Sequence, residues 1–171
     1  GEQVACVCPS TLGSDCLPVD EDCRPLRKAI LYGIDSRAQE EIAWMTAHYG
    51  PERMKELFGR PIVTGDVAAK ILWIKNHEPE VYRRTFKFLT GASYLTAKLT
   101  GEYVIDQFLG QASFRPLYRT DLTVNEEECA LYCRPDQLAR PRVVTDLAGG
   151  VISQAAKETG LAEGTCVITG T

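Results

Sequence analysis

The sequence has no long hydrophobic run and no basic leader. No apolar stretch approaches the roughly 20 residues that a membrane-spanning helix needs. The first residues, GEQVACVC, show no basic segment followed by an apolar one, so no secretory signal peptide is visible. Seven cysteines, an odd number, without such a signal favour free thiols in a reducing compartment. We therefore expect a cytoplasmic protein that does not enter a membrane.

An excess of positive charge is also missing. The chain has 19 Lys and Arg residues against 23 Asp and Glu residues, a formal net charge of −4. Surfaces that bind nucleic acid or acidic membranes carry an excess of basic side chains. The charge balance therefore argues against a general nucleic-acid partner or a membrane-surface partner.

Common catalytic and metal-binding motifs are absent as well. The sequence contains no Gly-x-Gly-x-x-Gly, no phosphate loop with Lys-Ser/Thr, no His-Glu-x-x-His and no Gly-x-Ser-x-Gly. Cys6-x-Cys8 and Cys129-x-x-x-Cys133 do not match a zinc spacing, and the two histidines, His48 and His77, are not paired with them. We predict no metal site and expect the cysteines to be mostly small buried side chains.

The residues that are present indicate one folded domain that mixes helices and strands. The 171 residues, 44% hydrophobic and 25% charged, are enough for a real core, and no repeat or linker divides them. Apolar runs between turn residues predict strands at 3–8, 16–19, 29–34, 86–89, 103–105 and 165–171. The first three strands, joined by short connections, predict an antiparallel meander or the tail of a mixed sheet.

Helix signals separate these strands. Apolar spacing, caps, glycines and prolines predict helices at 36–49, 51–58, 67–77, 91–99, 125–133 and 151–159, with irregular chain at 110–119 and 134–142. Ser36 and Gln39 fit a capping box, Gly50-Pro51 ends that helix, and Asp66 is placed to cap the helix that Glu78-Pro79 ends. Because helices and strands mix throughout, we predict an α/β fold.

The most distinctive stretch runs from 69 to 106. A helix ending in His77-Glu78-Pro79-Glu80 precedes an apolar strand, and a helix that contains Tyr94-Leu95 ends in Leu99-Thr100-Gly101-Glu102. This pattern resembles the FGGY family of sugar and polyol kinases, most of all its xylulokinase-like members. The resemblance extends in both directions over nearly the whole chain.

The resemblance implies a fold and an activity. Residues 1–171 would be a single partial domain, the sugar-binding part of a ribonuclease-H-like, actin-like first domain. The leading hairpin with Asp-x-Gly-Thr/Ser would precede Gly1, and the nucleotide-binding C-terminal domain would follow Thr171. The complete protein would use ATP and Mg²⁺ to phosphorylate a sugar or polyol hydroxyl. This chain alone would bind neither and would be inactive.

The family's catalytic aspartate follows an apolar strand like the one at 167–170. It takes the proton from the attacking hydroxyl and so acts as a general base. It is expected just after Thr171, so we assign no catalytic residue within this chain. A domain without its leading hairpin would also expose strand edge and apolar surface, which would favour a homo-oligomer.

The resemblance also implies a substrate-binding set. Asp35-Ser36-Arg37 matches the family's Asp-x-Arg, the loop 10–15 takes the place of its sugar-contacting loop, and Thr64-Gly65-Asp66 matches a further loop before Lys70. Short polar groups suit a sugar, because each hydroxyl buried without a partner costs roughly 1–3 kcal/mol. The candidate substrate-binding residues are Gly13, Ser14, Asp15, Asp35, Arg37 and Asp66.

Each candidate also has a purely structural interpretation. Asp35 and Asp66 would cap helices, Arg37 would be solvated in a first turn, and Ser14 with Asp15 would shape a hairpin turn. Xylulokinases place Met-His-Gly in the loop at 10–15, which this chain does not have, so the sugar stays open. Two other functions also remain: a non-catalytic sugar-binding or regulatory scaffold, and a structural or partner-binding domain.

Overall fold

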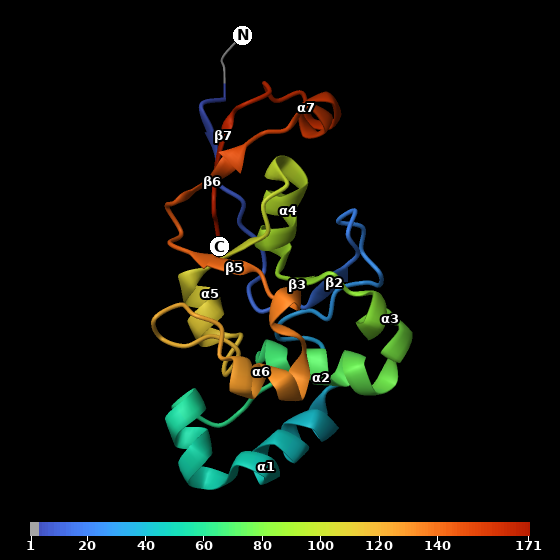
Figure 1. The fold of residues 1–171 in the computed structure, drawn as a ribbon, viewed down its shortest axis with the longest axis vertical. Helices are drawn as coiled ribbons and strands as arrows, with labels where there is room; N and C mark the ends of the chain where they lie inside the picture. Colours follow the sequence, from blue (N-terminus) through green and yellow to red (C-terminus); the bar gives the residue numbers. More distant parts are fainter. Residues whose placement is uncertain (1–3) are drawn as a thin grey trace.

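The two ends of the chain meet in one small sheet. The computed structural model describes residues 4–171, so the start of the predicted strand 3–8 lies outside the described residues. β1 (Cys6–Val7) runs parallel to β7 (Cys166–Ile168), and β6 (Leu147–Gly150) pairs antiparallel with β7 on its other side. Figure 1 shows this sheet with α7 (Ser153–Thr159) at one end of the molecule and α1 (Gln39–Phe58) at the other. The first strand therefore belongs to a mixed sheet, and the prediction of an antiparallel meander is wrong.

Two smaller sheets lie between these ends. β2 (Leu17–Val19) pairs antiparallel with β3 (Lys87–Leu89), and β4 (Val104–Asp106) pairs parallel with β5 (Arg140–Arg142). The strand predicted at 29–34 is reduced to a single antiparallel bridge between Ile30 and Cys16. β5 and β6 were not expected, because proline and glycine are rare inside strands and pairing with distant segments outweighs that preference here.

α1 is two helices joined at a glycine. Gly50 has φ 64° and ψ 175°, which breaks the helix, and Pro51 begins the second part, as predicted. Gly59 closes it in the left-handed conformation. The predicted capping box is wrong, because the helix begins at Gln39 and its N-cap residue makes no side-chain bond.

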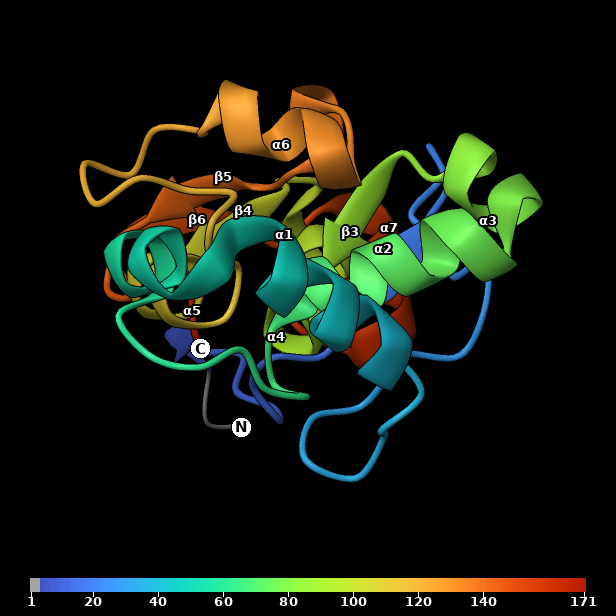
Figure 2. The ribbon, with the colours of Figure 1, turned by 90° about the horizontal axis from the view of Figure 1, so that it is seen from below.

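The core centres on α2 (Val67–His77). Seven of its residues are buried, from Val67 to Leu72 together with Ile74. α1, α3 (Pro79–Arg84) and α6 (Glu126–Tyr132) all contact it, and Figure 2 shows α1 lying in front of α2 with α6 nearby. Burying so much apolar surface fixes the start of α2, which carries the candidate residue Asp66.

α4 (Gly91–Thr100) connects the core to the end sheet. The Thr90 side chain accepts a hydrogen bond from the Ser93 N–H at 3.2 Å, and Gly101 ends the helix in the left-handed conformation, as predicted. α4 contacts β3, β4, β6, β7 and α7. It therefore holds the end of β7 in a fixed position relative to the core.

α5 (Gln107–Ala112) follows β4 directly and was not predicted. The Asp106 side chain caps it by accepting a hydrogen bond from the Leu109 N–H at 3.0 Å. The remaining short elements are a 3₁₀ turn, η1 (Pro135–Gln137), and the helix α7. Among the described residues, no helix is both long and apolar enough to cross a membrane.

The cysteines divide into two groups. Four of them are buried, Cys16, Cys23, Cys129 and Cys133. The expectation of burial is wrong for Cys6 and Cys8, which are exposed like Cys166, because one face of the β1–β7 pair is open.

Candidate functional site

The loop 10–15, which we call the substrate loop, lies beside the end of β7. Parallel strands β1 and β7 present their carboxyl ends at the same edge of the sheet, where α/β proteins commonly bind ligands. The Thr171 N–H donates to the Pro9 carbonyl at 3.0 Å, and the Thr11 N–H donates to the Thr171 carbonyl at 3.2 Å. The start of the substrate loop is therefore hydrogen-bonded to Thr171, the residue after which the catalytic aspartate is predicted.

Gly170 allows this close approach, and its replacement tests it. Its φ is 72°, and a Cβ there would collide with the Pro9 carbonyl oxygen. We expect Gly170→Ala to lower the free energy of unfolding by roughly 3 kcal/mol, from both φ strain and the collision. Gly160→Ala is the matched control, because Gly160 has φ 77° with nothing within 4 Å of a Cβ, and it should cost only about 1 kcal/mol. Equal losses in urea unfolding would contradict the contact with Pro9.

Ser14 and Asp15 are both buried, and other segments hold them in place. The Tyr32 N–H donates to Asp15 Oδ1 at 3.0 Å, and the hydroxyls of Ser14 and Ser113 share a hydrogen bond of 2.5 Å. Burial raises the pKa of the Asp15 carboxyl, while the Tyr32 hydrogen bond and the charge of Lys70 oppose that rise. Asp15 Oδ2 has no donor among residues 4–171 and is available as an acceptor.

Lys70 is the residue that organises the site, and the sequence interpretation did not assign it. The residue is 1% exposed, and its ammonium donates to the carbonyls of Ser14 at 2.6 Å and Leu31 at 3.3 Å. Burial lowers the pKa of Lys70, and nearby negative groups, including three aspartates, oppose this. In the sequence, the one signal that could have pointed to Lys70 was its position within the otherwise apolar start of the helix predicted at 67–77. The aspartates are Asp15, Asp35 and Asp66, and with Ser14 and Lys70 they form what we call the Lys70 cluster.

Asp35 and Arg37 bind each other. The Arg37 Nε contacts both Asp35 carboxylate oxygens, at 2.9 and 3.0 Å, and Nη2 lies 2.8 Å from Oδ2. This pairing holds the pKa of the Asp35 carboxyl below its usual value. The Arg37 guanidinium also lies 4.8 Å from the centre of the Trp73 ring, a cation–π contact. The Asp-x-Arg side chains thus form a pair on the surface of α2, and Asp35 does not cap α1.

Asp66 occupies the N-cap position of α2, but its side chain does not cap the helix. The carboxylate is fully buried and binds the Arg60 guanidinium through both oxygens, at 2.7 and 2.8 Å. It also accepts the Val63 N–H at 2.7 Å. Arg60 in turn donates to the Ala112 carbonyl at 3.1 Å, so Asp66 fastens the loop 60–66 to the end of α5.

Two glycines allow the loops of the site to pack closely. A Cβ on Gly13 would lie 3.0 Å from the Leu109 side chain on α5. A Cβ on Gly65 would lie 2.9 Å from the Tyr32 ring. Gly13 therefore lets the substrate loop pass against α5, and it has no side chain with which to bind a substrate.

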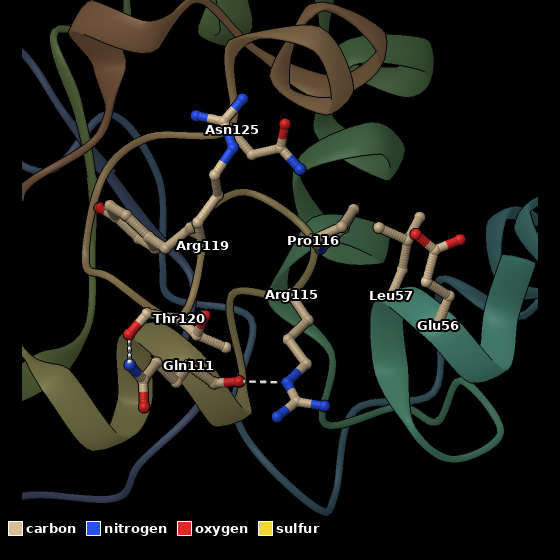
Figure 3. Close-up of a pocket in the computed structure, with 9 residues that line it drawn as sticks. Glu56, Leu57, Gln111, Arg115, Pro116, Arg119, Thr120 and Asn125 are labelled. Carbon is tan, nitrogen blue, oxygen red and sulfur yellow. Dashed lines mark hydrogen bonds between the residues drawn. The ribbon is translucent and has the colours of Figure 1, made fainter.

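A cavity of about 330 Å³ lies elsewhere, between the second part of α1 and the chain after α5. None of the six candidate residues lines it, although two arginines do. Figure 3 shows Arg115 and Arg119 pointing apart, and each donates to backbone carbonyls, Arg115 to Gln111 and Phe58, and Arg119 to Val124. The two guanidiniums do not converge, so this cavity is not built as a site for a phosphate or a carboxylate.

The described residues offer no group of side chains built to hold Mg²⁺. Among residues 4–171, no three His, Cys, Asp or Glu side chains are close enough to share a metal ion. Within the Lys70 cluster, the carboxylates of Asp35 and Asp66 already bind arginines. We therefore assign no metal ligand and no metal-dependent step to this chain.

Comparison with known proteins identifies the family. Residues 1–171 match the model of the N-terminal domain of the FGGY family of carbohydrate kinases. The xylulose kinase of Bacillus subtilis is 28% identical over 153 residues, which cover 89% of this chain and 30% of that protein. The L-xylulose/3-keto-L-gulonate kinase of Escherichia coli is 30% identical over 179 residues, which cover 99% of this chain and 34% of that protein.

Solved structures agree with this assignment. The xylulose kinase of Rhodospirillum rubrum superposes with a TM-score of 0.88 at 25% identity, covering 98% of this chain and 35% of that one. The gluconate kinase of Lactobacillus acidophilus has the same fold, with a TM-score of 0.86 at 20% identity, covering 100% of this chain and 35% of that one. The chain belongs to the FGGY family of carbohydrate kinases, and the predicted α/β, actin-like fold is confirmed. It spans about a third of the length of these relatives.

Proposed function

We propose that this chain is the sugar-binding part of an ATP-dependent carbohydrate kinase that transfers a phosphoryl group to a hydroxyl of a sugar or polyol. In this proposal the complete protein has further segments, which supply the phosphate-binding hairpin, the general base and the nucleotide-binding domain. ATP and Mg²⁺ bind there. The proposed enzyme is cytoplasmic, and a homo-oligomeric state remains a prediction.

The observation that carries the proposal is the position of the substrate loop. Its start is hydrogen-bonded to Thr171, so a general base placed shortly after that residue would lie near a sugar bound to Ser14 and Asp15. The carboxylate would accept the proton of the attacking hydroxyl, a step that depends mainly on positioning.

The six candidate residues divide into two roles in this proposal. Ser14 and Asp15 contact the sugar, and the Asp35–Arg37 pair lies at the outer edge of the Lys70 cluster, where it can exchange partners with a hydroxyl. Gly13 and Asp66 position the loops, because Gly13 has no side chain and the Asp66 carboxylate is fully buried.

Sugar-dependent release of ADP from ATP by the complete protein tests this proposal. We expect release with at least one sugar from a panel of ketopentoses, polyols and aldonic acids, and none from the 171-residue chain alone. Release by the isolated chain would contradict the proposal that other segments supply the general base and the nucleotide-binding domain. Sugar binding by the complete protein without any ADP release would instead show a non-catalytic scaffold.

A further inference from the structure

A second cavity lies where α2 meets α1 and α6, and we call it the helix groove. α2 packs against both of these helices, as Figure 2 shows. The helix groove has a volume of about 700 Å³, and its lining includes Glu40, Glu41, Trp44, Lys75 and His77. None of the six candidate substrate-binding residues lines it. A ligand held there would therefore bind separately from the sugar.

The Glu41 carboxylate lines this groove, and only one of its two oxygens has a partner. The residue is 4% exposed, its Oε1 accepts a hydrogen bond from Asn76 Nδ2 at 3.2 Å, and His77 Nε2 lies 3.1 Å from the same oxygen. Glu41 Oε2 is buried and has no hydrogen-bond partner among residues 4–171. A buried carboxylate oxygen without a donor is unfavourable, because it has lost its water. A ligand that brings an N–H donor and a positive charge would remove this cost.

The two basic side chains of the lining do not supply the missing donor. The Lys75 ammonium donates to the Leu131 carbonyl at 2.7 Å on the side of α6. The His77 ring stacks on Trp73, with the ring centres 4.9 Å apart, and its Nε2 faces Glu41 Oε1. Oε2 is therefore left for a group that comes from outside the described residues.

The rest of the lining also suits a positive charge. Glu40 is exposed and adds a second carboxylate to the groove. The Trp44 ring is 46% exposed and stacks on His48, with the ring centres 4.8 Å apart. Cations bind to the face of an indole ring better than to that of any other aromatic side chain. A buried acceptor, a second carboxylate and an exposed indole thus meet in one groove.

We propose that the helix groove binds a small organic cation with a primary ammonium group, and that Glu41 Oε2 accepts its N–H. Glu40 balances a second positive charge, and the carbon chain of the ligand lies against Trp44. A neutral alcohol can donate the hydrogen bond but leaves the buried carboxylate without a counter-charge, and an anion can do neither. The proposal goes beyond the kinase function and does not depend on it, since no residue of the sugar site takes part.

Isothermal titration calorimetry on the complete protein, without ATP or sugar, tests this site. The probe is putrescine, with 1,4-butanediol as its neutral analogue and succinate as an anion of the same chain length. We expect putrescine to bind at least about 10-fold more tightly than the diol, the effect of a charge-assisted hydrogen bond, and succinate not to bind. Equal affinities for the diamine and the diol, or no binding of putrescine, would overturn the proposal.

Glu41→Gln tests the acceptor. The amide keeps an oxygen for Asn76 and His77 and replaces Oε2 with an NH₂ group that cannot accept, so putrescine should bind at least about 10-fold more weakly. Trp44→Ala, at an exposed position, should weaken binding about 3-fold. Glu52→Gln is the matched control, because it removes the same charge from an exposed position of α1 outside the groove. The melting temperature confirms folding, and an unchanged affinity in either folded groove variant would overturn the proposal.

Sedimentation velocity separates a free amine from a lysine side chain of a second protein molecule, which carries the same ammonium group. The proposal predicts one oligomeric state for the unaltered complete protein and for Glu41→Gln, with and without putrescine. Dissociation of an oligomer by the substitution or by the amine would show that a neighbouring copy fills the groove. That result would overturn the assignment of a small cation as the ligand.

Discussion

Replacing Lys70 with methionine is expected to weaken sugar binding more than any other change that leaves the helices intact. The variant loses both hydrogen bonds from the ammonium, to the Ser14 and Leu31 carbonyls, while the methionine keeps an unbranched side chain of similar length. We expect the free energy of unfolding to fall by about 2 kcal/mol, since each charged hydrogen bond stabilises by roughly 1.5–3 kcal/mol and burying the charge offsets part of this. In the complete protein, KM for the sugar should rise at least about 10-fold with a smaller change in kcat, because Lys70 positions the substrate loop.

Lys75→Met is the matched control for this prediction. Lys75 lies on the same helix and also donates to a backbone carbonyl, that of Leu131, at 2.7 Å. It does not contact the substrate loop, so a small loss of stability without a change in KM is expected. If the two variants shift KM equally, the effect of Lys70 is only a general effect of destabilising α2.

The second large effect is expected at Asp66. Asp66→Ala removes a fully buried carboxylate that binds Arg60 twice and accepts the Val63 N–H. We expect the free energy of unfolding to fall by about 3 kcal/mol, at the lower end for a broken buried ion pair, because the Arg60 side chain is 40% exposed and can be hydrated. Chemical denaturation measures this directly.

An exposed ion pair gives the comparison for Asp66. Glu80 pairs with Arg83, and their side chains are 74% and 65% exposed. Glu80→Ala should change the free energy of unfolding by no more than about 0.5 kcal/mol, as is usual for surface pairs. An equal, small loss from Asp66→Ala would show that the carboxylate does not hold the loop 60–66 in place.

Local signals in the sequence predicted the helix ends well. Gly50-Pro51, Glu78-Pro79, Gly101 and Gly160 each end a helix as expected, because proline and left-handed glycine act within a few residues. The strand pairings were not predictable in this way. β1 pairs with β7 at the opposite end of the chain, and β5 pairs with β4 despite Pro141. In both cases the partner strand lies far away in sequence, so no local pattern predicts the pairing.

The same distinction holds for the candidate site. The family pattern indicated Asp15, Asp35 and Asp66, but their surroundings depend on residues that are distant in sequence. Lys70 and Ser113 both hydrogen-bond to Ser14, and they lie 56 and 99 residues from Ser14 in the sequence. A single sequence gives no direct signal for such contacts. The pattern therefore supplied the candidate residues, and only the fold revealed that one buried lysine lies among three of them.

The most direct test of this account is a crystal structure of the complete protein with a neutral sugar substrate. The account predicts a sugar hydroxyl within hydrogen-bond distance, about 3 Å, of Asp15 Oδ2, with Lys70 still bound to the Ser14 carbonyl. A sugar bound instead in the cavity beside Arg115 and Arg119, with no contact to the substrate loop, would contradict it.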